Sequence, residues 1–312
     1  MAALDDRARD RVPEGVRGAD RNRRTAFLGL GIMGAPMAAN LAGAGFEVVV
    51  WNRTAEKARA LADEHDGILV AASPAEAAAA AGIVISMVPD TAEVEAVLLG
   101  DGGAAEGLPE GGLAIDMSTI APTASRSIAE RLGEHGIDFL DAPVTGSRPK
   151  AEDATLTIMA GGSEAAFERA RPLFDAMGEL VIHAGPQGHG SMVKLINNTL
   201  AAVNAAALAE GLTLARAAGL DTDRALEVVA SGSGNSAMVA LKAGPMLSGE
   251  LEPLFKLEHM LKDVRHFLAE AKALGMDLEL AKSAERIYTG AGEKGLGEQD
   301  FAAVIEAVGR PD

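Results

Sequence analysis

Between residues 25 and 187, short apolar segments alternate with segments of helical pattern, and this alternation limits the possible folds more than any other feature. We predict strands at residues 25–30, 47–51, 68–71, 83–88, 113–117, 138–144, 155–160 and 180–183. Helical patterns lie at residues 32–42, 54–63, 123–134 and 164–177. Strands separated by helices of this length pair in parallel through βαβ crossovers. Continuous apolar strands are typical of a sheet that is covered on both faces. The pattern therefore predicts an α/β domain with a parallel sheet.

The strand pattern ends after residue 185. We predict one long helix at residues 188–218, roughly 45 Å at 1.5 Å per residue. Shorter helices follow near residues 222–230, 238–244, 259–274, 277–290 and 300–308. We therefore expect three parts: a solvated extension over residues 1–24, the α/β domain over 25–187, and an all-helical domain over 188–312. Within the α/β domain, the alanine run at residues 77–81 predicts a helical surface.

Composition excludes several classes of protein. The chain has no cysteine, which rules out disulfides and thiolate metal sites. Acidic residues exceed basic ones by 45 to 28, a net charge of −17, and such a surface repels nucleic acid and anionic lipid. The six histidines show no metal-ligand spacing, so we predict no metal.

The sequence also favours a cytoplasmic protein. The longest apolar stretch, residues 195–220, is interrupted by asparagines and charges, so we interpret it as a buried helix and not a membrane span. Residues 1–24 lack the apolar core of a secretory signal and carry too many acids for a mitochondrial presequence.

A Gly-x-Gly-x-x-Gly motif links the first predicted strand to the first helix. In this context Gly29 allows a tight turn, Gly31 lets the backbone approach a pyrophosphate, and Gly34 lets the helix pack on the strand. The free N–H groups at the helix start can bind phosphate. The motif predicts a Rossmann-type dinucleotide-binding domain, because a chance glycine turn would not be expected between a strand and a helix.

The end of the second strand indicates which dinucleotide binds. NAD enzymes usually carry an acid here that binds the ribose 2′-hydroxyl. This chain has Asn52, Arg53 and Thr54 instead. Arg53 can pair with a 2′-phosphate and the Thr54 hydroxyl can donate to it, so the sequence predicts NADP, with NAD also possible. The alternative is that Arg53 only faces solvent.

Five segments in order carry a resemblance to a known family. They are residues 29–34 with Asn40, residues 116–119, residues 141–146, residues 190–198, and the pair Lys262 and Asp263. Together they resemble the β-hydroxyacid dehydrogenases, which include 3-hydroxyisobutyrate dehydrogenase, tartronate semialdehyde reductase and glyoxylate/succinic semialdehyde reductases. The resemblance covers the chain from about residue 25 to the last helix.

The resemblance implies hydride transfer between a small 3-hydroxy (or 2-hydroxy or 4-hydroxy) acid and its semialdehyde or keto partner. It implies that Lys194 is the general acid/base, giving a proton to the carbonyl during reduction. The substrate-binding residues that it implies are Ser118, Thr145, Gly146, Ser147 and Asn198. The family usually has Ser-Gly-Gly where this chain has Thr-Gly-Ser at residues 145–147, and residues 148–153 resemble the glyoxylate/succinic semialdehyde branch.

The motifs and the resemblance together give one set of cofactor residues: Gly29, Gly31, Ile32, Met33, Gly34, Asn52, Arg53, Thr54, Val88, Pro89, Thr119 and Lys262. The partners expected are a small anionic carbonyl or hydroxy-acid substrate and further copies of the chain, in a homodimer or homotetramer. Two alternatives stay open: an imine reductase of the same fold and a non-catalytic NADP-binding module. Both kinds of relative tend to lose the lysine, so Lys194 argues against them.

Overall fold

The computed structural model describes residues 24–309, so the extension predicted over residues 1–24 lies outside the described residues except for Arg24. The chain divides into two compact units between Lys194 and Leu195. The N-terminal unit contains every strand of the described chain, and the C-terminal unit is helical. The predicted fold class, a Rossmann-type domain followed by an all-α domain, is confirmed.

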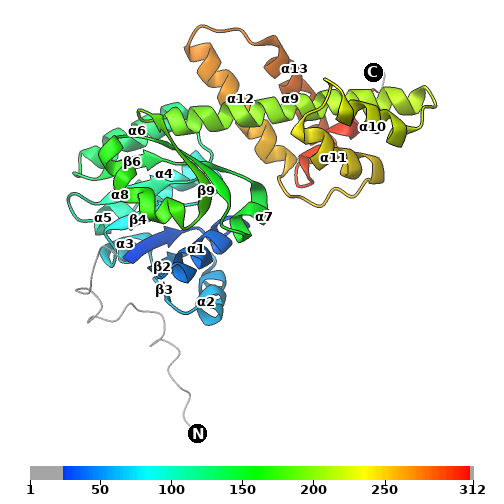
Figure 1. Cartoon of the computed structure of the whole chain (residues 1–312). Coiled ribbons are helices and arrows are strands. Elements are labelled where there is room, and N and C mark those ends of the chain that lie inside the picture. Colours follow the sequence, from blue (N-terminus) through cyan, green and yellow to red (C-terminus); the bar gives the residue numbers. More distant parts are fainter. Residues whose placement is uncertain (1–23, 310–312) are drawn as a thin grey trace. The chain divides into compact units, whose positions relative to one another are not determined.

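The N-terminal unit alternates strands and helices along the chain (Figure 1). Its strands are β1 (Arg24–Leu28), β2 (Glu47–Trp51), β3 (Ile68–Val70), β4 (Ile83–Ser86), β5 (Leu113–Asp116), β6 (Asp138–Asp141), β7 (Val144–Thr145), β8 (Leu156–Gly161) and β9 (Gly178–Gly185). Its helices are α1 (Gly34–Gly43), α2 (Ala55–Glu64), α3 (Pro74–Ala79), α4 (Thr91–Leu99), α5 (Ala104–Gly107), α6 (Pro122–Gly133), α7 (Ser147–Glu152) and α8 (Glu164–Asp175).

The strands form one sheet in the order β3-β2-β1-β4-β5-β6-β8-β7, with β9 beside β8. The first six have the 3-2-1-4-5-6 order of a dinucleotide-binding fold and pair in parallel. The prediction of a wholly parallel sheet is wrong beyond β6, because β8 runs antiparallel to both β6 and β7. The single strand predicted at residues 138–144 is two strands, since Pro143, which has no N–H to donate, lies between them.

Both faces of the sheet are covered. Alternate residues of β2 illustrate this: Val48 and Val50 pack in one apolar cluster with α1, α2 and α8, whereas Val49 packs in another with α3, α4 and α6. The alanine run at residues 77–81 was predicted to be a helical surface, but all but one of its residues are buried in the second cluster. Small side chains there let α3 approach the sheet closely.

The helices of the C-terminal unit begin with the long helix α9, whose first residues, up to Lys194, belong to the N-terminal unit. They are α9 (His189–Ala217), α10 (Thr222–Ser231), α11 (Ala237–Ser248), α12 (Leu257–Ala273), α13 (Glu279–Glu293) and the 3-10 helix η4 (Phe301–Ala307). Two predicted elements differ. α11 continues past Pro245 to a left-handed Gly249, and the last element is a 3-10 helix. By length and composition alone, α9 would suffice to cross a membrane, a test that core helices of soluble proteins also pass.

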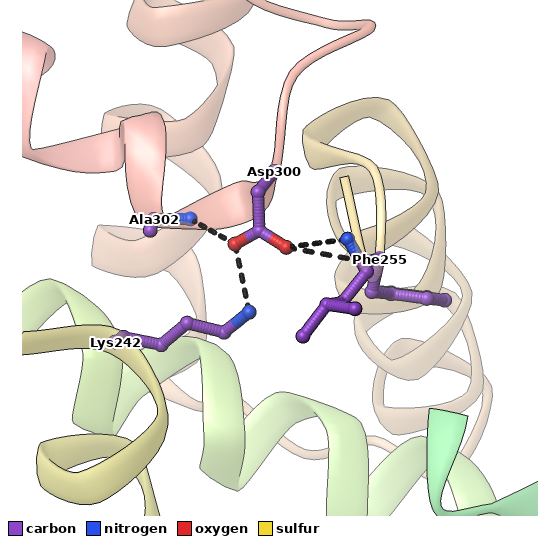
Figure 2. Close-up of polar contacts among 5 residues, drawn as sticks. Lys242, Phe255, Asp300 and Ala302 are labelled. Carbon is purple, nitrogen blue, oxygen red and sulfur yellow. Dashed lines mark hydrogen bonds and ion pairs between the residues drawn. The ribbon is translucent and has the colours of Figure 1, made fainter. Parts of the chain in front are cut away.

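A buried carboxylate organises the centre of this unit (Figure 2). Asp300 pairs with Lys242 of α11 at 2.7 Å, and it accepts N–H bonds from Leu254, Phe255 and Ala302. Lys242 also lies 4.1 Å from the centre of the Phe301 ring. Asp300 thus joins α11, the segment before α12 and the start of η4.

Candidate active site

Five strands of the N-terminal unit end in register. The residues paired across the sheet are Trp51, Leu28, Ser86, Asp116 and Asp141, the last residues of β2, β1, β4, β5 and β6. The loops that follow them therefore leave the sheet at one edge. Ligands of open α/β sheets bind outside this carboxyl edge.

The glycine loop lies at this edge directly after β1. Gly29 has φ +100°, and a side chain there would come within 2.3 Å of the Met87 carbonyl oxygen. A Cβ on Gly34 would lie 2.0 Å from the Gly29 carbonyl oxygen, so only glycine lets α1 start this close to the strand. Gly31 meets nothing within 4 Å, and the neighbouring Ile32 is exposed. The loop therefore presents open backbone next to the start of α1, which fits the pyrophosphate of a dinucleotide.

The residues after β2 contact this loop. The side-chain oxygen of Asn52 accepts a bond from the Leu30 N–H at 2.9 Å, and its Nδ2 donates to the Thr54 carbonyl. Asn52, predicted as a cofactor residue, therefore also braces the glycine loop. Arg53 and Thr54 are exposed beside it. An exposed guanidinium at this edge can reach a phosphate on the ribose.

Ser118 is held by the strand end that precedes it. Its hydroxyl donates to Asp116 Oδ1 at 2.7 Å and accepts from the Val88 N–H at 3.0 Å. Val88 in turn lies close enough to Gly29 to exclude a side chain there. Ser118 thus ties the loop after β4 to the loop after β5. Because its one hydroxyl proton is directed to Asp116, Ser118 can offer a ligand only its remaining lone pair in this arrangement.

Asp116 is completely buried, and burial raises its pKa to about 6. Hydrogen bonds from Ser118 and Ser86 oppose this rise, and the nearby charge of Asp141 adds to it. Asp116 Oδ1 accepts all of these bonds, while Oδ2 has no hydrogen-bond partner among residues 24–309.

The segment predicted to hold the substrate carboxylate runs from the last residue of β7 into the first residue of α7. Thr145, Gly146 and Ser147 are all half-buried at the start of α7. Gly146 has φ +135° and Ser147 has φ +57°, so two successive residues adopt backbone angles that favour glycine. The amide of Asn40 holds α7 by donating to the Ala151 carbonyl at 2.7 Å. Asn40 therefore has a structural role, because it fixes α7 to α1.

Lys194 lies near the start of α9 and is only 7% exposed. The first turn of this helix is bonded to Asp141, whose carboxylate accepts from the Gly188 and Ser191 N–H groups and from Gln187. Burial raises the pKa of Asp141, and these hydrogen bonds oppose the rise. The lysine therefore stands on a helix whose start is fixed to the carboxyl end of β6.

In the C-terminal unit, two predicted residues surround another buried acid. Asn198 Nδ2 donates to Asp263 Oδ2 at 2.6 Å, and Asn197 Nδ2 donates to the Asn198 oxygen at 3.1 Å. Lys262 Nζ lies 3.4 Å from Asp263 Oδ1. The predicted roles of Asn198 at the substrate and of Lys262 at the cofactor stay predictions.

Sequence reasoning missed the buried acids as site-forming residues. Asp116, Asp141 and Asp263 each stand inside a segment that carries the family resemblance, yet only their neighbours were predicted to act. For Asp116 and Asp141 the available signal was an acid at the end of an apolar strand, which is costly unless it is hydrogen-bonded. Gln187, which donates to Asp141, lies in a loop, and no sequence pattern marked it as a site residue.

Comparisons with known proteins cover nearly the whole described chain. Residues 24–185 match the family model described as the NAD binding domain of 6-phosphogluconate dehydrogenase. Residues 188–308 match the model described as NAD-binding of NADP-dependent 3-hydroxyisobutyrate dehydrogenase.

Individual relatives agree with these models. Glyoxylate/succinic semialdehyde reductase 1 of Arabidopsis thaliana is 39% identical over 90% of this chain and 97% of its own length. The 2-hydroxy-3-oxopropionate reductase of Escherichia coli is 34% identical over 91% and 97%. A crystal structure of 3-hydroxyisobutyrate dehydrogenase from Salmonella typhimurium is 33% identical, covers 91% of this chain and 99% of its own, and has a TM-score of 0.82.

Proposed function

Because this chain belongs to the β-hydroxyacid dehydrogenase family of NAD(P)-dependent oxidoreductases, we propose that it interconverts a small hydroxy acid and its semialdehyde or keto partner, with NADP(H) preferred and Lys194 transferring the proton. NADPH supplies a hydride to the carbonyl carbon when it is bound. The chain must then deliver a proton to the carbonyl oxygen and hold the substrate carboxylate.

The observation that carries the proposal is the place of Lys194. Its side chain is buried on a helix that is anchored to the same sheet edge as the glycine loop. An ammonium group can give a proton to the developing alkoxide and stabilise its charge before the transfer. In the oxidation direction, the neutral amine takes the hydroxyl proton. Ser118 and Thr119 are weaker acids and suit this task less well.

The segment at residues 145–147 supports an anionic substrate. Gly146 and Ser147, both with positive φ, lie half-buried at the start of α7, and Thr145 adds a hydroxyl beside them. Backbone N–H groups and a hydroxyl suit a carboxylate. Residues 148–153 resemble the glyoxylate/succinic semialdehyde branch, so we propose glyoxylate and succinic semialdehyde as the first substrates to test, a choice consistent with the Arabidopsis relative.

Arg53 supports the preference for NADP. No acid stands at the end of β2 to repel a 2′-phosphate, and the exposed guanidinium lies next to a loop braced by Asn52. An Arg–phosphate pair is a strong charge-assisted interaction.

A substrate panel tests the reaction class. NADPH oxidation should be followed with glyoxylate, succinic semialdehyde and methylmalonate semialdehyde, and with a cyclic imine as the comparison. Turnover of at least one semialdehyde or keto acid and none of the imine is expected. Turnover of the imine alone would point to the imine reductase alternative, and NADPH binding without any turnover would point to a non-catalytic module.

A further inference from the structure

The carboxylate of Asp141 is bonded to the helix that carries Lys194. Its Oδ1 accepts the Gly188 N–H at 2.7 Å and Gln187 Nε2 at 2.7 Å, and its Oδ2 accepts the Ser191 N–H at 2.6 Å. Asp141 is fully buried at the end of β6. Both oxygens of one carboxylate are therefore engaged by residues that lie 46 to 50 positions later in the chain.

These bonds do more than satisfy the helix start. The first N–H groups of a helix lack partners within the helix, and a negative charge there interacts favourably with the helix dipole. A cap usually comes from the residue just before the helix. Here it comes from a strand of the sheet, so the same bonds fix where α9 begins relative to β6.

The backbone of this turn also packs closely against β8. A Cβ on Gly190 would lie 2.2 Å from the Met159 carbonyl oxygen, and a Cβ on Gly161 would lie 2.7 Å from the Gly190 nitrogen. The helix therefore lies directly on the backbone of β8. Lys194 follows Ser191 by about one helical turn, so a shift of the first turn moves the lysine with it.

We propose that Asp141 is a positioning residue for Lys194, acting through the first turn of α9. This inference rests on the proposed role of Lys194 in proton transfer. A misplacement of about 1 Å can cost on the order of a hundredfold in rate. An amide cannot replace the carboxylate, because three N–H donors converge on it from two sides and an asparagine has one acceptor oxygen.

Kinetics of Asp141→Asn provide the first test. We expect turnover to fall roughly ten- to a hundredfold, while the dissociation constant for NADPH changes less than about threefold. Asp221→Asn is the matched control, because Asp221 caps α10 with the same kind of bonds to the Asp223 and Arg224 N–H groups. The control should keep its turnover. Equal turnover losses in the two variants would overturn the proposal.

A double-mutant cycle separates positioning from a general structural role. In a Lys194→Ala background, Asp141→Asn should lower the residual turnover less than about twofold, because there is no lysine left to position. If the turnover losses of Asp141→Asn and Lys194→Ala multiply in the double variant, Asp141 does not act by positioning Lys194, whereas the proposed function of Lys194 is unaffected. Full turnover of Lys194→Ala alone would contradict the proposed function itself, and the positioning role with it. If Asp141→Asn does not fold, Gln187→Met takes its place in the same cycle. This change removes one bond to Asp141 and the bond to Ser125 Oγ. It should lower turnover less than Asp141→Asn, and that loss should also disappear in the Lys194→Ala background.

Discussion

At the scale of single residues, the neighbouring carboxylates of Asp116 and Asp141 at the sheet edge differ in how the protein hydrogen-bonds them. Asp141 receives N–H groups on both oxygens, whereas all the bonds to Asp116 converge on Oδ1. The environment of Asp116 therefore compensates poorly for a buried charge, and its pKa is raised to about 6.

This difference gives a pH dependence of stability. Between about pH 4 and pH 6 the folded protein keeps the Asp116 proton, and the unfolded chain, with its ordinary pKa of 3.8, has lost it. The contribution of Asp116 to stability is therefore greatest below about pH 4 and declines until about pH 6. Asp116→Asn can keep the bonds to Oδ1 without burying a charge. It should raise the free energy of unfolding by up to about 3 kcal/mol at pH 7.5, and the gain should vanish near pH 4.

Urea denaturation at several pH values checks this expectation. Asp138→Asn is the control, since Asp138 is an exposed acid at the other end of β6, where its pair with Arg169 is open to solvent. A loss of stability in Asp116→Asn at pH 7.5 would mean that the charged form is stabilised in the folded protein.

The second prediction at this scale concerns Arg53 and the preference for NADPH over NADH. NADPH should bind at least about tenfold more tightly than NADH, about 1.4 kcal/mol. Arg53→Ala should remove most of that preference by weakening NADPH, while NADH affinity stays nearly constant and serves as the internal control. Fluorescence titration with both cofactors measures it. Equal affinities in the unaltered protein would show that the guanidinium only faces solvent.

At the scale of elements, long periodic segments could be predicted and short capped ones could not. The helix predicted at residues 188–218 is observed as His189–Ala217, because a 3.6-residue pattern over many turns is unambiguous. Of α3, only the alanine run at its end was predicted as helical, although Ser73 caps its start by accepting the Glu76 N–H and the Glu76 carboxylate accepts the Ala72 N–H. α4 was missed entirely, although Asp90 caps its first N–H.

The Asp300 centre of the C-terminal unit carries a stability prediction at this scale. Lys242→Ala should lower the free energy of unfolding by about 3–5 kcal/mol, because it leaves a buried carboxylate without its cation. Lys256→Ala breaks an exposed pair with Glu298 and should lose far less. Denaturation curves of both variants decide the matter. Similar small losses would show that the three N–H bonds to Asp300 suffice.

At the scale of the whole molecule, the sequence was sufficient for the fold class and for the family. Alternating strands and helices, one glycine motif and the loss of strand pattern after residue 185 determine the architecture. The arrangement of the site could not be predicted in the same way. The contact of Asp141 with Gln187 and the antiparallel β8 depend on packing between segments far apart in the sequence, which local patterns do not encode.

The assembly of the molecule gives a further prediction. We expect a homodimer or homotetramer, because the C-terminal unit exposes large apolar side chains such as Leu200 on α9 and Leu280 on α13. Both residues line one groove of this unit. Light scattering coupled to size-exclusion chromatography should give two or four times the 31.9 kDa of the chain. A stable monomer at micromolar concentration would contradict the expectation.

The central claim is that Lys194 transfers the proton, and steady-state kinetics of Lys194→Ala with a cofactor titration test it most directly. Turnover should fall on the order of a hundredfold or more, the usual scale for losing a general acid–base. NADPH affinity should change little, because Lys194 acts at the reacting carbonyl and not at the phosphates. Lys194→Arg should not restore turnover, since a guanidinium does not give up its proton near neutral pH. A folded Lys194→Ala variant with near-full turnover would show that the proton comes from another group.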